Sequence, residues 1–266
     1  MPIEISKAIK RITQKEFHEL DEIVLKHVFD IHNSFGRFGD EKMYRNQLKD
    51  SLLSSGITSE QEVCIKVSYK DFLKLYFIYL LVMESAIYEF KTVEFLNDSH
   101  KQQLIHYLLL TGLNHGQLIN FRQPSVTKQF VSTNLNSQLR HRYNLSFNDW
   151  DNSLGNSATL KNIMTEVIQE WGAFLNYNLY RDAALYFLGG KEKMIKPVNV
   201  IGSRKIVGQQ KFSLLNDRTA FHISSISRQT ALYENHMRRL LKHVELDTIQ
   251  WINFDKHNIT FKTIQK

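Results

Sequence analysis

The tripeptide Glu89-Phe90-Lys91 is the segment of this sequence that points most directly to a chemical function. It falls within residues 86–93, whose composition predicts a β-strand. Residues two apart on a strand point to the same face, so the carboxylate and the ammonium group would lie side by side. A carboxylate there can bind a divalent metal, and a lysine beside it can orient or activate a water molecule. Taken alone, the tripeptide is a weak signal, because Glu and Lys two apart are common on exposed strands.

Other polar residues strengthen the signal through their place in the chain. Glu41 and Tyr44 follow a glycine-containing turn at residues 35–39, and Gln103 and Tyr107 lie on a predicted helix that follows the Glu-x-Lys strand. Glu41, Glu89, Lys91 and Gln103 are therefore the candidate catalytic residues of the sequence, and Glu41 and Glu89 are its candidate metal ligands.

The spacing of apolar residues predicts an α/β fold for residues 1–121. Recurrence at helical spacing predicts helices, and alternation or a short apolar run predicts strands. The predicted order is helix, helix, three strands, helix and strand, at residues 20–31, 41–54, 63–69, 75–83, 86–93, 99–111 and 117–121.

The rest of the chain repeats this order after a break. Residues 122–158 are rich in Asn, Ser and Gln and show weak periodicity, which predicts a partly ordered linker. Residues 159–266 then form a second predicted unit, with helices near residues 160–168, 180–188 and 233–243 and strands near residues 198–200, 206–215, 220–226, 248–254 and 259–264.

An internal duplication accounts for the repeated order. A shift of 133 residues places 65–121 on 198–254 without a gap, and Asn120-Phe121 falls on Asn253-Phe254 at the end of a predicted strand. In the helical part, Gly36 and Tyr44 fall on Gly172 and Tyr180 with an offset of 136. We therefore expect two tandem copies of one unit.

The first copy resembles the GxxExxY protein family, a branch of the PD-(D/E)XK nuclease-like superfamily, over about residues 20–121. The matching stretches are residues 35–44, 80–82, 89–93, 103–108 and 116–121, although the glycine that gives the family its name is displaced. The resemblance implies a restriction-endonuclease-like core and a site built from Glu41, Glu89, Lys91 and Gln103. It also implies an aspartate just before Leu80-Leu81-Val82, where this sequence has Tyr79. The site would therefore lack its bridging carboxylate.

The second copy retains no carboxylate at the corresponding positions. The offset of 136 makes Tyr177 the counterpart of Glu41. The offset of 133 makes Phe212, His222, Ser224 and His236 the counterparts of Tyr79, Glu89, Lys91 and Gln103, in that order. This copy is predicted to be non-catalytic, with His222 and His236 as ordinary buried or rim residues; binding of zinc or copper by the two imidazoles is the weaker alternative.

Positive charge is concentrated in the second half of the chain. The net charge is +7, but residues 1–135 carry 16 Lys/Arg against 16 Asp/Glu, whereas residues 136–266 carry 18 against 11. A basic half can bind nucleic acid, although a solvated surface explains the excess equally well. The candidate phosphate-binding residues are Arg140, Arg142, Arg238, Arg239 and Lys242.

Several classes of protein do not fit the sequence. No apolar run reaches the ~18 residues of a membrane span, residues 1–14 lack the apolar core of a signal peptide, and the single cysteine, Cys64, excludes an intrachain disulfide. A cytoplasmic protein without membrane contact is the simplest interpretation.

Three functions remain open at this point. The first is a degenerate nuclease-like protein that binds DNA, RNA or a protein partner and needs no cofactor. The second is a nuclease that uses Mg²⁺ or Mn²⁺ at a reduced site. The third is a structural protein in which Glu89 and Lys91 form a leftover ion pair.

Overall fold

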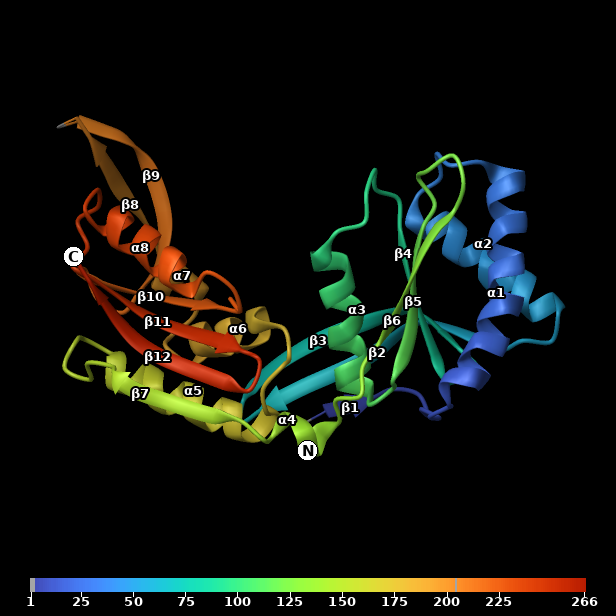
Figure 1. Ribbon diagram of the computed structural model, residues 1–266, viewed down its shortest axis with the longest axis horizontal. Helices are drawn as coiled ribbons and strands as arrows, with labels where there is room; N and C mark the ends of the chain where they lie inside the picture. Colours follow the sequence, from blue (N-terminus) through green and yellow to red (C-terminus); the bar gives the residue numbers. More distant parts are fainter. Residues whose placement is uncertain (1–2, 204) are drawn as a thin grey trace. The chain divides into compact units, whose positions relative to one another are not determined.

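The computed structural model describes residues 3–203 and 205–266, which form two compact units (Figure 1). The first unit contains Leu73–Ser137 and the described residues up to Ser68, and the second contains Tyr69–Phe72 and Gln138–Lys266. Each unit is built on a six-stranded mixed sheet flanked by helices, so the predicted fold class is confirmed.

The sheet of the first unit has the order β1-β2-β3-β4-β5-β6. Strands β4 and β5 are parallel, while β1–β2, β3–β4 and β5–β6 are antiparallel pairs. A parallel pair needs a crossover connection, and α3 provides it. The elements are β1 (Ile3–Ile5), α1 (Gln14–Phe35), α2 (Glu41–Ser54), β2 (Ser59–Tyr69), β3 (Phe72–Val82), β4 (Ala86–Lys91), α3 (Asp98–Thr111), β5 (His115–Asn120) and β6 (Thr127–Ser132).

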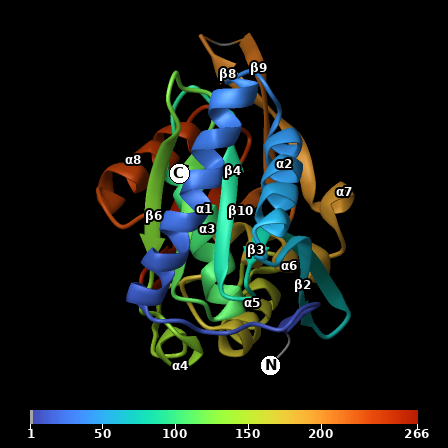
Figure 2. The same ribbon diagram turned by 90° about the vertical axis from the view of Figure 1, so that its right-hand side faces the viewer.

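Helices cover both faces of this sheet, with α1 and α2 on one face and α3 on the other (Figures 1 and 2). Ile119 and Phe121 belong to the buried cluster that α1 and α2 form with the sheet. Gly116 allows α3 to approach the opposite face closely, because a Cβ atom there would lie 3.0 Å from Cδ1 of Leu104. The two faces of the sheet are therefore buried by different helices.

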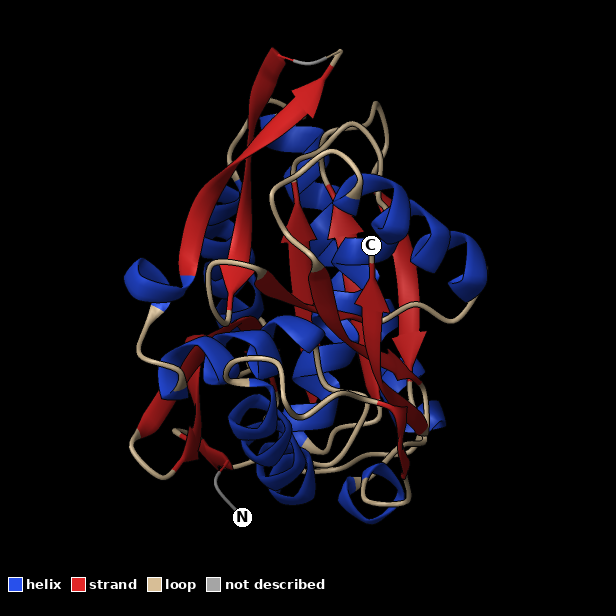
Figure 3. Ribbon diagram, turned by 90° about the vertical axis from the view of Figure 1, so that its left-hand side faces the viewer, coloured by secondary structure: helices blue, strands red, loops and turns tan. Residues whose placement is uncertain are grey.

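The second unit has the sheet order β7-β12-β11-β10-β9-β8. Strands β10–β11 and β7–β12 are parallel, and α8 connects β10 to β11. In Figure 3, β8 and β9 form a long hairpin that extends past the helices of this unit. The elements are α4 (Ser137–Arg140), β7 (Asn144–Asp149), α5 (Ser157–Trp171), α6 (Tyr177–Phe187), α7 (Lys191–Met194), β8 (Ile195–Gly202), β9 (Lys205–Leu214), β10 (Thr219–Ser224), α8 (Thr230–Leu241), β11 (Thr248–Asp255) and β12 (Asn258–Gln265).

Residues 122–158 differ from the predicted linker, because both ends of this segment are regular. Strand β6 pairs with β5 over six residues and so extends the first sheet, whereas β7 pairs with β12 in the second sheet. Both are edge strands with many exposed side chains, so they lack the apolar alternation by which a strand is recognised. The first sheet thus continues past residue 121 to the end of β6 at Ser132.

The two units share the same arrangement of five strands. Strands β2 to β6 follow one another in the first sheet as β8 to β12 do in the second. The registers agree as well, because Tyr88 pairs with Gln117 and Phe221 pairs with Gln250, each 133 residues later.

An asparagine at the end of the central parallel pair makes the same two hydrogen bonds in each unit. The Asn120 side chain accepts from the Val93 backbone N–H at 3.1 Å and donates to the Val93 carbonyl at 2.8 Å. Asn253 accepts from the Ile226 N–H and donates to the Ile226 carbonyl, both at 2.9 Å. Val93 and Ile226 are also 133 residues apart.

A buried tyrosine fixes the first two helices in each unit. The Tyr44 hydroxyl donates to the Gly36 carbonyl at 2.6 Å, and its ring stacks on Phe121 at 4.1 Å. The Tyr180 hydroxyl donates to the Gly172 carbonyl, and its ring packs on Phe254 at 4.5 Å. Gly36 and Gly172 end α1 and α5 with φ values of 69° and 76°, a conformation that favours glycine.

Candidate functional site

The predicted site of the first unit lies where β3 and β4 diverge. These strands pair only through Leu80–Tyr88, Leu81–Ile87 and Val82–Ala86. Beyond these pairs lies a pocket of about 390 Å³. Its lining includes the predicted residues Glu41, Tyr79, Glu89, Lys91, Gln103 and Tyr107, together with Arg45, Glu62, Leu75, Tyr76 and Phe77. The structure therefore brings the four candidate catalytic residues together.

A chain of hydrogen bonds links the polar residues of β4 and α3. The Lys91 ammonium group donates to Oε1 of Glu89 at 2.8 Å and to Oε1 of Gln103 at 3.1 Å. The Gln103 amide donates in turn to the Tyr107 hydroxyl at 3.2 Å. Gln103 and Tyr107 are one helical turn apart, so they share the face of α3 that lines the pocket.

Glu89 is the most deeply buried charged residue of this pocket, with 1% of its surface exposed. Its Oε2 atom has no hydrogen-bond partner within the described residues. Burial raises the pKa of the Glu89 carboxyl, although the nearby Lys91 ammonium group opposes this shift. The ion pair with Lys91 is therefore the main compensation for placing a carboxylate here.

Glu41 enters the pocket from the start of α2. The Asp40 side chain caps this helix by accepting from the Met43 N–H at 2.7 Å. Oε1 of Glu41 then accepts from the backbone N–H of Thr92 at 3.3 Å, just after β4 ends. The two candidate metal ligands thus enter the pocket from different elements, α2 and β4.

Tyr79 lines the same pocket as Glu89 and comes just before the last residue pair of β3 and β4. That pair is Leu80–Tyr88, and continuing its antiparallel register by one residue would place Tyr79 across from Glu89. The Tyr79 ring contacts Phe90 edge to face at 6.1 Å, and the Arg45 guanidinium lies 4.5 Å from its centroid. Burial, followed by the nearby Glu41, raises the pKa of the Tyr79 phenol to about 12, so the side chain is neutral at pH 7.

Arg45 and Glu62 were missed by the sequence analysis. Arg45 is buried, and its guanidinium forms an ion pair with Glu62 at 3.0 Å. A signal for Arg45 existed in the sequence, because the offset of 136 that relates Tyr44 to Tyr180 also relates Arg45 to Arg181. Tyr44 itself is a core residue rather than part of the pocket.

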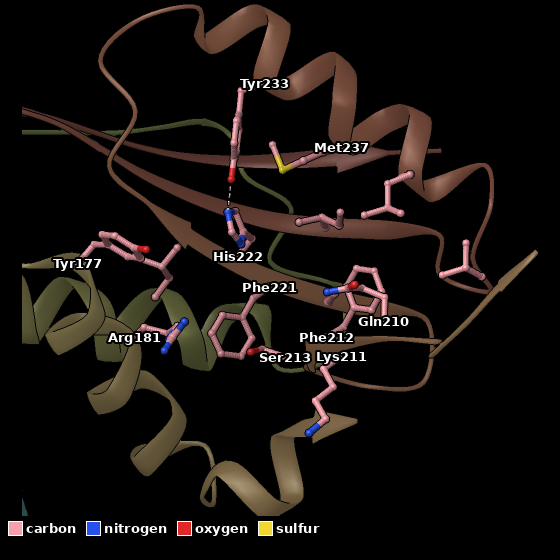
Figure 4. A pocket seen from close by; sticks show the side chains of 15 residues that line it. Tyr177, Arg181, Gln210, Lys211, Phe212, Ser213, Phe221, His222, Tyr233 and Met237 are labelled. Carbon is pink, nitrogen blue, oxygen red and sulfur yellow. Dashed lines mark hydrogen bonds between the residues drawn. The ribbon is translucent and has the colours of Figure 1, made fainter. Parts of the chain in front are cut away.

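The second unit has a pocket of about 450 Å³ in the corresponding place (Figure 4). Strands β9 and β10 pair only through Leu214–Ala220 and Ser213–Phe221 before they diverge. Three of the predicted replacements, Tyr177, Phe212 and His222, line this pocket.

Two replacements lie elsewhere. Ser224 is bonded to Asn253 and to the Trp251 indole N–H, each at 2.8 Å, within the core. His236 is exposed, and the residue of α8 that meets His222 is Tyr233, whose hydroxyl lies 2.7 Å from Nε2 of the imidazole. The offset of 133 therefore holds for the strands, and on α8 it identifies Leu240, the counterpart of Tyr107, as a pocket residue but fails for His236.

The basic candidates fall into two groups. Arg140 is only 1% exposed and donates to the Trp171 carbonyl at 2.8 Å, so its prediction as a phosphate-binding residue is corrected. Arg142 is exposed, as are Arg239 and Lys242 near the end of α8. Arg238 is partly exposed but donates to Glu234 at 2.8 Å and to the Gln265 carbonyl at 3.0 Å.

A divalent metal has few ligands in the first pocket. Within residues 3–203 and 205–266, no group of three or more His, Cys, Asp and Glu side chains is placed to hold a metal ion. Glu41 and Glu89 supply oxygen atoms, but Oε1 of Glu89 already accepts a hydrogen bond from Lys91. Tyr79 is neutral and adds no charge. Glu62 is the third carboxylate of the pocket, and it is paired with Arg45 as Glu89 is paired with Lys91.

None of the helices in the described part of the chain is long and apolar enough to cross a membrane.

The comparisons with known proteins concern the first unit. No curated protein and no solved structure matches the chain. Residues 18–132 match the family model described as the PD-(D/E)XK nuclease superfamily, and this stretch includes β6 as well as the pocket. The first half of the chain therefore contains a PD-(D/E)XK nuclease-like domain.

Proposed function

We propose that this protein is a duplicated, degenerate member of the GxxExxY branch that binds nucleic acid without cleaving it. The observation that carries the proposal is the composition of the first pocket. Glu89 is paired with Lys91 at 2.8 Å, and Tyr79 lines the same pocket where the resemblance implies an aspartate. Lysine already balances the charge of the buried carboxylate, so the pocket has little need of a metal.

The duplication rests on contacts that shared periodicity does not require. Common apolar spacing could align strands by chance, but it would not repeat the paired Asn120–Val93 and Asn253–Ile226 hydrogen bonds. Nor would it repeat a tyrosine that bonds to the glycine ending the preceding helix and packs on a phenylalanine after the central strand.

The binding surface is proposed to lie on the second unit, in keeping with its positive charge. Four basic residues, Arg238, Arg239, Lys242 and Lys266, line a hollow of about 400 Å³ together with Asn235 and Gln265. Cations near the end of α8 also interact favourably with the helix dipole, so their position alone does not require a ligand. Binding of a protein partner with an acidic surface, in place of nucleic acid, is the other outcome of the test. We also propose that the protein is located in the cytoplasm.

Reversing two of these charges is expected to weaken nucleic-acid binding for all sequences alike. Arg239→Glu with Lys242→Glu should lower affinity by roughly tenfold or more at low salt and flatten the dependence of log K on log salt, because phosphate contacts release counterions. Arg238 is left unchanged since it bonds to Glu234 and Gln265. The measurement is fluorescence anisotropy with single- and double-stranded DNA and RNA.

A double variant of the first unit provides the matched control. Lys15→Glu with Lys26→Glu changes the net charge equally at two exposed residues of α1. It should retain most of the affinity. Equal losses in both variants, or no binding of the unmodified protein at low salt, would remove nucleic acid as the ligand of this surface.

A metal-dependent nuclease is the second candidate, and one observation favours it. Oε2 of Glu89 is buried without a hydrogen-bond partner in the described part of the chain, and the pocket beside it is lined by polar groups. Magnesium often uses only one or two carboxylates and keeps several water molecules, so Glu41 and Glu89 could bind Mg²⁺ or Mn²⁺ once substrate phosphate is present. Cleavage that depends on Glu89 would establish this candidate.

A further inference from the structure

The pocket of the second unit has the opposite charge to its counterpart in the first unit. The first pocket contains Glu41, Glu62 and Glu89 against Arg45 and Lys91, a formal charge of −1. The second contains Arg181 and Lys211 and no carboxylate, a formal charge of +2 with histidine neutral. Burial, followed by the positive charge of Arg181, lowers the pKa of His222, which is consistent with a neutral imidazole at pH 7. The second pocket is therefore suited to an anion.

One arginine is common to both pockets but has different neighbours. In the first unit, Arg45 is held by Glu62 and packs on Tyr79. Its counterpart Arg181, on α6, is exposed and forms no ion pair with any described residue. The position that corresponds to Glu62 under the offset of 133 is Ile195, so the second unit has no carboxylate there to bind the guanidinium. Arg181 is thus free to bind a carboxylate or phosphate with paired hydrogen bonds.

Flat side chains line the same pocket as this arginine. Tyr177, which takes the place of Glu41, lies one helical turn before Arg181 on α6, and Phe212 and Gln210 enter from β9 (Figure 4). His222 and Tyr233 are joined by a hydrogen bond, and their rings are stacked with centroids 5.8 Å apart. These rings and the Met237 side chain can contact a planar group, while the Gln210 amide can donate and accept hydrogen bonds at its edge.

We propose that this second pocket binds an unpaired nucleotide, with the base against the aromatic side chains and the phosphate on Arg181. A cavity of about 450 Å³ lies within the usual range for small-molecule sites. Aromatic side chains stack on any base, and arginine binds phosphate with paired hydrogen bonds, so the lining matches both parts of a nucleotide. A free mononucleotide and an exposed nucleotide of a single strand share this chemistry. The proposal extends the proposed function, because the pocket would give the protein a preference for unpaired nucleic acid.

Calorimetric titration of the full chain tests this pocket with four probes. These are adenosine 5′-monophosphate, adenosine, inorganic phosphate and a 5′-phosphorylated single-stranded DNA of eight nucleotides. Arg181→Gln should weaken binding of the monophosphate by about tenfold and leave adenosine unchanged, since a charged hydrogen bond of ~1.5 kcal/mol is lost. Tyr177→Ala should weaken both by about tenfold, because stacking contributes ~1–3 kcal/mol for each base. Arg37→Gln, at an exposed arginine of the first unit, is the control and should change neither.

The probes separate the two sources and the two proposals. Competition between the monophosphate and the oligonucleotide would place both in this pocket, whereas binding of the monophosphate alone would identify a free nucleotide as the ligand. If the oligonucleotide binds equally well to the unmodified protein and to both pocket variants, and the monophosphate does not bind, the pocket inference is wrong while nucleic-acid binding stands. Equal affinity of all variants for the monophosphate would also overturn the inference.

Discussion

Replacing Tyr79 with aspartate is expected to turn the first pocket into a Mn²⁺ site. The new carboxylate would line the same pocket as Glu89 and Glu41, whose charges both act on Tyr79 in the present protein. The new carboxylate and a cation ~4 Å away would attract each other by ~4 kcal/mol for each pair of unit charges, at an effective dielectric constant of ~20. The Arg45 guanidinium, which packs on the Tyr79 ring, would also attract the new carboxylate and so reduce the gain in metal affinity. We therefore expect Mn²⁺ affinity to rise by about tenfold to a hundredfold.

Calorimetry with the Tyr79→Asn variant isolates the effect of charge. Asparagine matches aspartate in size, so both variants lose the ring packing on Phe90 and Arg45 and differ only in the carboxylate. Tyr79→Asn should bind Mn²⁺ no better than the unmodified protein does. Equal affinities for the aspartate and asparagine variants would show that the missing carboxylate is not what limits the site.

Truncation of Tyr44 or Tyr180 is expected to cause the largest loss of stability, each in its own unit. Both rings are fully buried, and each hydroxyl donates to the carbonyl of the glycine that ends the preceding helix. Removing a buried aromatic ring costs ~3–5 kcal/mol. Tyr44→Ala should therefore raise hydrogen exchange mainly in the first unit and Tyr180→Ala mainly in the second, with comparable losses in denaturant unfolding.

The phenylalanine variants separate packing from hydrogen bonding. Tyr44→Phe and Tyr180→Phe keep the ring on Phe121 and Phe254 but leave the glycine carbonyl without its donor. Each should cost only ~1–2 kcal/mol. If one alanine variant costs less than ~1 kcal/mol, the two tyrosines do not have equivalent roles and the argument for duplication weakens.

The strands of the central sheets were predictable because the sequence there carries strong local signals. Strands β4 and β11 are almost wholly buried and include apolar residues such as Ile87 and Ile252, and the offset of 133 preserves their pairing residue by residue. The edge strands β6 and β7 were not predictable, since their side chains are largely exposed and their pairing is decided by strands elsewhere in the sequence.

The site residues of the first unit were predictable because they lie on the elements that carry the resemblance, with Glu41 on α2, Glu89 and Lys91 on β4 and Gln103 on α3. The burial of Arg140 was not predictable from the sequence, because its hydrogen-bond partner, the Trp171 carbonyl, is 31 residues away. His236 illustrates a second limit. The gapless offset places Leu240 at the pocket as the counterpart of Tyr107, but it does not fix which other residues of the helix face the pocket, because a helix turns ~100° for each residue. Tyr233 therefore faces the pocket while His236 is exposed.

The most direct test of the central claim is a cleavage assay on the unmodified protein with Glu89→Ala as its control. Single- and double-stranded DNA and RNA would be incubated with Mg²⁺ or Mn²⁺, and binding would be measured on the same samples. The Lys91 ammonium group balances the charge of Glu89, and the neutral Tyr79 supplies no charge for a metal. We therefore expect salt-dependent binding of nucleic acid, and we expect the unmodified protein to cleave no more than Glu89→Ala does. Cleavage by the unmodified protein that is abolished in Glu89→Ala would contradict the account and show that the first pocket is a working nuclease site.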